Sequence, residues 1–253
     1  MCLLLISYNT HPKYKLIIAA NRDEFYNRPA ESAHLWNDSN ILAGKDLKAG
    51  GTWLGITRTG RFAAITNYRD KAELISDAPS RGDLVTGFLN ANSSTQEFAQ
   101  HISERADQYN GYNLIFADKT DINYFSNKSK KHIVLTPGIY GLSNHLLDTP
   151  WPKVEKSKKS FTGILNNANV SPDDLFEILS DKSIPPDELL PDTGIGLEIE
   201  RAVSPVFVST PLYGTRSSTV LFIDRAGEVT FTERTLNINS GEWTTNSFQF
   251  KIE

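Results

Sequence analysis

The sequence predicts an α+β protein built on mainly antiparallel sheets, and three observations support this prediction. Short runs rich in Leu, Ile, Thr and aromatic residues, which are typical of strands, fill both ends of the 253-residue chain. Helical patterns occupy its middle. Strands and helices do not alternate regularly, as they would in a βαβ fold. Because the chain contains no internal repeat, low-complexity tract or linker, we expect a single domain over residues 1–253.

The N-terminal part predicts a sheet of hairpin-linked strands. Its strand-like runs are CLLLISYN, KLIIAANR, TWLGITR and RFAAITNY. Gly60 lies between the last two runs, where glycine suits a tight reversal. The pair Gly50-Gly51 lacks the spacing of a phosphate-binding loop, so we interpret it as a turn that enters a strand.

Three helix starts follow. Ser94 and Glu97 form a capping box, Trp151-Pro152 opens a second helix, and Ser171-Pro172 opens a third. The apolar positions expected to face the core are Phe98, Ile102 and Ala106 in the first helix, Val154, Phe161, Ile164 and Leu165 in the second, and Leu175, Phe176 and Leu179 in the third.

The helix after Trp151 also carries a run of positive charge. Its lysines are Lys153, Lys156, Lys158 and Lys159. We interpret them as a solvated helix face, which is what such runs usually are. The alternative is a rim that contacts an anion.

Strand patterns return in the remaining segments. YNLIFAD and INYFSN form a natural pair, and the C-terminal third contributes PVFVST, STVLFID, EVTFTERT and SFQFKI. The residues DRAGEV supply a turn between the second and third of these C-terminal strands.

Composition excludes several classes of function. The chain has 26 Lys and Arg against 30 Asp and Glu, a net charge of −4, so it has no overall positive field to attract nucleic acid. One cysteine forms no internal disulfide, and the five histidines are scattered without a metal-ligand spacing. We therefore expect no dedicated metal site and no required cofactor.

We expect a cytoplasmic protein. The apolar stretch Cys2–Ile6 is too short for a signal-peptide core and has no basic residues ahead of it. No later segment has the length of a transmembrane helix. A reducing compartment also fits a thiol that stays unoxidised.

Cys2 is the first candidate catalytic residue. If Met1 is removed, the α-amine of Cys2 becomes available to accept the proton of its own thiol, so the nucleophile needs no separate histidine. The alternative is a small apolar residue at the start of a buried strand.

A polar cluster follows the second apolar run. Asn21, Arg22, Asp23 and Glu24 are consecutive, and strand alternation places Asn21 with Asp23 on one face and Arg22 with Glu24 on the other. Near Cys2, Arg22 would lower the thiol pKa or bind an anionic substrate group, and Asp23 would hold the α-amine. An ordinary surface turn with local ion pairs is the alternative.

Three later residues complete the candidate set. Asn67 and Asn144 are amides at strand or loop ends, the type of donor found in oxyanion holes, although asparagines are also common in turns. Arg216 precedes a strongly apolar strand and is a candidate second anion clamp, with an edge-strand arginine as the alternative. Ser143 lacks Asp and His partners in the order of a serine triad.

Taken together, the motifs resemble the Asn-Arg-Asp-Glu (NRDE) family, which is the Transport and Golgi organisation 2 family. The matching blocks run from residue 1 to about 235 and are Met1-Cys2 with its apolar strand, NRDE at 21–24, AGGTWLGIT at 49–57, ITNYR at 65–69, SRGDLV at 80–85, GYNL at 111–114, GLSN at 141–144 and YGTRSST at 213–219.

The resemblance implies an αββα sandwich of the N-terminal-nucleophile (Ntn) hydrolase type, related to cysteine acylases that cleave penicillin V and conjugated bile salts. In those relatives a cysteine, an arginine, an aspartate, oxyanion asparagines and a late arginine cooperate. The corresponding candidates here are Cys2, Arg22, Asp23, Asn67, Asn144 and Arg216. The spacing departs from the acylases, because Arg22 and Asp23 are adjacent in this chain.

Two functions remain open from the sequence. The first is a Cys2 hydrolase of an amide C–N bond, or of a thioester, in a small anionic substrate. The second is a carrier that uses the same pocket without turnover to bind haem or an acyl-CoA. The carrier interpretation follows from the association of the resembled family with haem trafficking and acyl-CoA metabolism. In both, Asn21, Arg22, Glu24 and Arg216 are the candidate ligand-binding residues.

Overall fold

A computed structural model describes residues 2–37, 39–71 and 74–253. Contacts along the chain group into two compact units. Unit 1 comprises residues 1–27, 137–143 and 147–251, and unit 2 comprises residues 28–136, 144–146 and 252–253. Each unit is assembled from separate stretches of the chain, and the single-domain interpretation stays a prediction.

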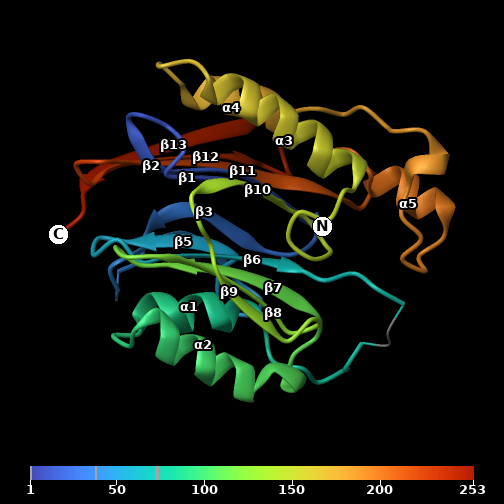
Figure 1. Ribbon diagram of the computed structural model, residues 1–253. Coiled ribbons are helices and arrows are strands. Elements are labelled where there is room, and N and C mark those ends of the chain that lie inside the picture. The colour runs from blue at the N-terminus through green and yellow to red at the C-terminus, as the bar shows by residue number, and fades with distance from the viewer. Residues whose placement is uncertain (1, 38, 72–73) are drawn as a thin grey trace. The chain divides into compact units, whose positions relative to one another are not determined.

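Unit 1 is built on an antiparallel sheet that has six strands within the described residues. Their order is β10 (Gly138–Leu142), β1 (Cys2–Tyr8), β2 (Tyr14–Phe25), β11 (Tyr213–Asp224), β12 (Glu228–Leu236) and β13 (Trp243–Lys251). Residues from the two ends of the chain thus meet in the middle of one sheet, where β2 pairs with β11 (Figure 1).

One face of this sheet is covered by α3 (Pro152–Leu165) and α4 (Pro172–Leu179) (Figure 1). Alternate side chains such as Leu3, Leu5 and Ile17 join Phe161 and Leu175 in the core beneath these helices. The predicted starts of both helices are confirmed, and Ser171 forms a capping box with Asp174. Unit 1 also contains α5 (Leu197–Val203) and the 3₁₀ turn Asp187–Leu189.

Unit 2 is built on an antiparallel sheet with seven strands among the described residues. Their order is β3 (Ala30–Leu35), β4 (Ile41–Asp46), β5 (Leu54–Thr57), β6 (Phe62–Asn67), β7 (Tyr112–Ala117), β8 (Ile122–Ser126) and β9 (Lys131–Val134). Gly60 has φ 84° at the turn before β6, which confirms the predicted reversal.

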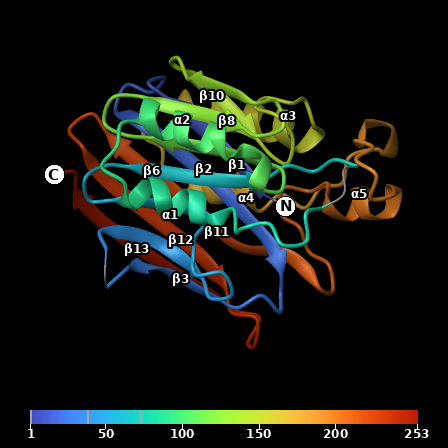
Figure 2. The same cartoon turned by 90° about the horizontal axis from the view of Figure 1, so that it is seen from below.

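The helices of unit 2 are α1 (Gly82–Asn90) and α2 (Thr95–Glu104), and the 3₁₀ turn Ala106–Gln108 follows them. Figure 2 shows both helices lying over the same sheet. Phe88 of α1, Phe98 of α2 and Phe116 of β7 pack edge to face with ring centroids 4.9 to 5.4 Å apart. The capping box of Ser94 and Glu97 is confirmed.

The predicted strand PVFVST is wrong. Val206 and Val208 are buried, but among the described residues the segment forms a single isolated bridge, between Ser209 and Gly214. Side chains satisfy part of its backbone: the Asn21 amide donates to the Val206 carbonyl at 2.9 Å, and the Thr215 hydroxyl accepts from the Val208 N–H at 3.0 Å. The alternating pattern therefore indicated burial without a strand ladder.

The interpretation of all four lysines as a solvated face needs a correction. Lys153 is buried, and its ammonium donates to the Val203 carbonyl at 2.8 Å. Lys156 and Lys159 are exposed, as expected. The difference arises because Lys153 lies in the first turn of α3, where its ammonium reaches the carbonyl of the last residue of α5.

Candidate active site

Cys2 begins β1, and the strand register brings it directly opposite Arg22 on β2. Directly opposite residues in an antiparallel pair project their side chains to the same face. The main chain of Cys2 is held by Ser143, whose hydroxyl donates to the Cys2 carbonyl at 2.9 Å. Two neighbouring strands, β1 and β2, therefore place a thiol and a guanidinium side by side at one end of the sheet.

The NRDE segment is part of β2 and is largely buried, so the surface-turn alternative is wrong for this segment. Arg22 is 6% exposed, and its guanidinium lies 3.8 Å from the carboxylate of Glu24, which is 24% exposed. This ion pair confirms the prediction that Arg22 and Glu24 share a face.

Asp23 is on the opposite face of β2 from Arg22, and its partners lie on the neighbouring strand β11. The Thr215 hydroxyl donates to the Asp23 carboxylate at 2.7 Å, and the Tyr213 hydroxyl donates to the Asp23 carbonyl at 2.9 Å. Asp23 is 5% exposed. Burial raises the pKa of this carboxyl, and the nearby charges of Lys153 and Arg22 together with the Thr215 hydrogen bond act against that rise.

Burial also raises the pKa of the Cys2 thiol, although the residue as a whole is half-buried. The Asp23 carboxylate adds to the rise, whereas a hydrogen bond from the Asp23 backbone and the charge of Arg22 oppose it. The thiol is therefore protonated at neutral pH, and a base has to remove its proton before it can act as a nucleophile.

Arg216 is the extra residue of an irregularity in β11, where the pairing with β2 shifts register between Thr215 and Ser217. Its guanidinium donates to the carbonyls of Phe25 at 2.9 Å and Tyr26 at 3.3 Å. Because β11 lies between β2 and β12, the edge-strand alternative is wrong. Burial lowers the pKa of Arg216, and the like charge of Arg22 lowers it further. Arg22 is near because it pairs in register with Ser217, the next residue of β11.

Asn21 uses its side chain inside the fold. Its amide donates to the carbonyls of Leu179 at 2.8 Å and Val206 at 2.9 Å, and its oxygen accepts from the Ser218 hydroxyl at 2.6 Å. Asn21 is 2% exposed. Its contacts connect the end of α4 and the segment around Val206 to the middle of the sheet, and its ligand-binding role stays a prediction.

Asn67 and Asn144 belong to unit 2. The Asn144 amide donates to the Asn67 carbonyl at 2.8 Å, and the Asn144 carbonyl accepts from the Arg69 N–H at 2.7 Å. Asn144 is buried and Asn67 is exposed at the end of β6. The structure thus joins these two candidates to each other, and their role as oxyanion donors stays a prediction.

Two partners of the site were not predicted from the sequence. Thr215 lies in the YGTRSST block and faces Asp23 across the strand pair, a contact between residues 192 positions apart. Lys153 comes from α3 and contributes a buried positive charge near Asp23. The burial of Lys153 leaves no local signal, since it depends on a carbonyl fifty residues away.

The described residues, 2–37, 39–71 and 74–253, contain neither a metal-binding cluster nor a membrane-spanning helix. Among those residues, no group of three or more His, Cys, Asp or Glu side chains is arranged to hold a metal ion. No helix in that part of the chain is long and apolar enough to cross a membrane.

A solved structure shares this fold. The C2A mutant of a conjugated bile acid hydrolase from Clostridium perfringens superimposes with a TM-score of 0.53 and covers 98% of this chain and 97% of its own, at 12% sequence identity. At that identity the likeness shows the fold alone. The chain has the fold of the Ntn hydrolases, with two antiparallel sheets, and the predicted fold class is confirmed.

Sequence comparison identifies much nearer relatives. The Transport and Golgi organisation 2 family matches residues 1–238. The mouse homologue of its namesake is 38% identical and the human homologue is 39% identical, and each alignment covers 100% of both chains. These matches extend over all the motifs discussed above, from Cys2 to the YGTRSST block. The chain therefore belongs to the Transport and Golgi organisation 2 family.

Proposed function

We propose that this chain hydrolyses an amide C–N bond, or a thioester, in a small anionic substrate, with Cys2 as its nucleophile. The register that sets Cys2 opposite Arg22, with Asp23 next along β2, is the main observation behind the proposal. The bile acid hydrolase that shares the fold supports it too, because its C2A mutant implies a cysteine at the second position of that enzyme.

The proposed reaction starts with the removal of Met1, which makes the α-amine of Cys2 available as the base. The amine takes the thiol proton, and the thiolate attacks the substrate carbonyl to form a tetrahedral oxyanion. The C–N bond then breaks, the ammonium returns the proton to the leaving amine, and Cys2 carries the acyl group as a thioester. Water hydrolyses this thioester, which releases the acid and restores the thiol.

The raised pKa of the Cys2 thiol explains why this reaction needs a base so close to the sulfur. A carboxylate such as Asp23 would hold the ammonium form of the amine. Asn67 and Asn144 remain the proposed oxyanion donors, each through its side-chain amide. Arg22 and Arg216 supply the positive charge for an anionic substrate group.

A carrier function is the second candidate, favoured by the pair of buried arginines. Two nearby cations, Arg22 and Arg216, would stabilise a bound anion whether or not Cys2 reacted with it. The ligand would be an acyl-CoA or haem, and haem would need an axial ligand from Cys2, a histidine or a tyrosine.

Intact-mass spectrometry of the purified protein tests the proposal first. We expect the mass of the chain without Met1, and a further increase by one acyl group at Cys2 after treatment with an activated acyl ester. The Cys2→Ser variant is the control and should not form a stable thioester adduct. A chain that retains Met1 and shows no acylation of Cys2 would refute the hydrolase.

Turnover assays then separate the hydrolase from the carrier. With an amide that carries a carboxylate, Arg22→Met and Arg216→Met should raise KM about tenfold, and with a neutral amide of equal size they should change KM little. Saturable binding of an acyl-CoA or haem without any turnover would favour the carrier instead.

A further inference from the structure

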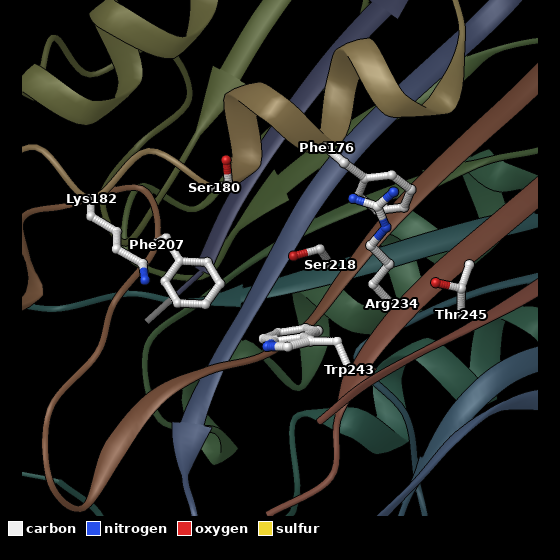
Figure 3. Close-up of a pocket in the computed structure, with 8 residues that line it drawn as sticks. All are labelled: Phe176, Ser180, Lys182, Phe207, Ser218, Arg234, Trp243 and Thr245. Atoms are coloured by element: carbon white, nitrogen blue, oxygen red, sulfur yellow. The ribbon is translucent and has the colours of Figure 1, made fainter. Parts of the chain in front are cut away.

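A cavity lies on the helix-covered face of the unit 1 sheet. The cavity has a volume of about 470 Å³, within the usual range for small-molecule pockets. Residues from α4, β11, β12 and β13 line it, together with the segments that contain Lys182 and Phe207 (Figure 3). Every one of these residues belongs to unit 1.

The cavity is separate from the Cys2 site. Its base includes Ser218, which pairs with Asn21 in the register of β11 and β2. Cys2 pairs with Arg22, the next residue of β2, and successive residues of a strand point to opposite faces. The cavity and the thiol therefore lie on opposite faces of the sheet.

Aromatic rings form the walls. The rings of Phe207 and Trp243 lie 5.7 Å apart between centroids at 53°, and Phe176 lines the opposite part of the cavity near Arg234 (Figure 3). Trp243 keeps 38% of its surface exposed on strand β13. An indole in such a position offers an open face on which a flat ring can stack.

The charge that faces the cavity is positive. Lys182 lies 5.0 Å above the Phe207 ring, and the Arg234 guanidinium stacks 4.0 Å from the Phe176 ring. Arg234 also pairs with Asp173 at 2.7 Å, whereas no carboxylate among the described residues pairs with Lys182. The eight lining residues include no Asp or Glu.

From this combination we propose that the cavity binds a small aromatic anion, a flat ring bearing a carboxylate, sulfonate or phosphate. The ring would stack on Trp243, and the anionic group would reach Lys182 or the open edge of Arg234. The hydroxyls of the lining would accept or donate further hydrogen bonds. The lining contains no His, Cys, Met or Tyr to ligate a haem iron, so this site is distinct from the carrier candidate.

Equilibrium dialysis against three soluble probes tests the proposal. Indole-3-acetate has the ring and the charge, indole-3-acetamide lacks the charge, and cyclohexylacetate lacks the aromatic ring. We expect saturable binding of indole-3-acetate with a Kd in the millimolar range or below, and weaker binding of the other two by about threefold or more. Equal binding of all three probes, or no saturable binding, would overturn the proposal.

Variants then locate the site. Trp243→Leu should weaken binding of indole-3-acetate about tenfold, and Lys182→Met about threefold. Lys13→Met is the matched control, because Lys13 also lies over an aromatic ring, Tyr14 at 5.1 Å, but lines none of the cavity. Circular dichroism confirms that each variant is folded.

The same experiment on Cys2→Ser separates this site from the proposed hydrolase. Binding should be unchanged, since the thiol lies on the other face of the sheet. A loss of indole-3-acetate binding in Cys2→Ser together with full binding in Trp243→Leu would place the probe in the Cys2 site and refute the second one.

Discussion

Replacement of Asn21 by alanine tests whether the first residue of the NRDE segment supports the fold. The side chain makes three buried hydrogen bonds, to the carbonyls of Leu179 and Val206 and from the hydroxyl of Ser218. Alanine removes this contact from all three partners. Asn21 is only 2% exposed. Each buried polar group that loses its partner costs about 1 kcal/mol or more, so we expect a loss of about 3 kcal/mol in the free energy of unfolding.

Thermal unfolding followed by circular dichroism measures this loss. For a chain of this size, about 3 kcal/mol corresponds to a fall in Tm of about 6–12 °C. Asn169→Ala is the matched control, because Asn169 is exposed, and its Tm should change by no more than about 2 °C. If Asn21→Ala behaves like this control while ligand affinity falls, the reasoning is wrong and Asn21 is a ligand-binding residue.

Further predictions concern the thiol, two glycines and the buried lysine. In a chain that retains Met1, the rate of Cys2 alkylation should rise with pH, and its midpoint should lie above the pKa of an ordinary cysteine, because burial and Asp23 raise the thiol pKa. Asp23→Asn should lower that midpoint. Alkylation that is quenched after a fixed time at each pH and followed by mass spectrometry measures the midpoint. The same midpoint in Asp23→Asn would contradict the role given to Asp23. Gly214→Ala should destabilise the chain by about 2 kcal/mol, since a Cβ there would lie 2.7 Å from the Val208 carbonyl oxygen. Gly87→Ala, in α1 with open space around it, should stabilise the chain by about 0.5–1 kcal/mol, and urea unfolding measures both glycine variants. Lys153→Met should cost about 2 kcal/mol through the bond to the Val203 carbonyl, whereas the exposed Lys159→Met should stay within about 0.5 kcal/mol.

The sequence predicted the side-chain directions within the NRDE segment, because they depend on the two-residue period of a strand. Arg22 and Glu24 form an ion pair on one face. Asn21 and Asp23 bond to Ser218 and Thr215 of β11 on the other. A local rule was sufficient for these directions, since each follows from the position of its neighbour in the chain.

Features set by distant contacts could not be predicted in the same way. The irregularity at Arg216 depends on how β11 pairs with β2, a strand that lies far away in the sequence. Lys153 occupies a position that a helical pattern predicts to be solvated, and its burial depends on a contact with the last residue of α5. Val206 and Val208 show a strand-like pattern although side chains of β2 and β11 satisfy part of their backbone. A pattern of apolar residues reports burial and leaves the hydrogen-bond partner open.

The two faces of β2 call for different interpretations of mutants. Asn21 and Asp23 hold α4, the segment around Val206 and β11 to the sheet, so a loss of activity in their variants mixes altered chemistry with altered structure. Arg22 and Glu24 lie on the face of Cys2, where their side chains pair with each other. Variants of Arg22 that keep their Tm and change KM for an anionic substrate therefore report on the site itself, and they carry more weight for the hydrolase than any variant of Asn21 or Asp23.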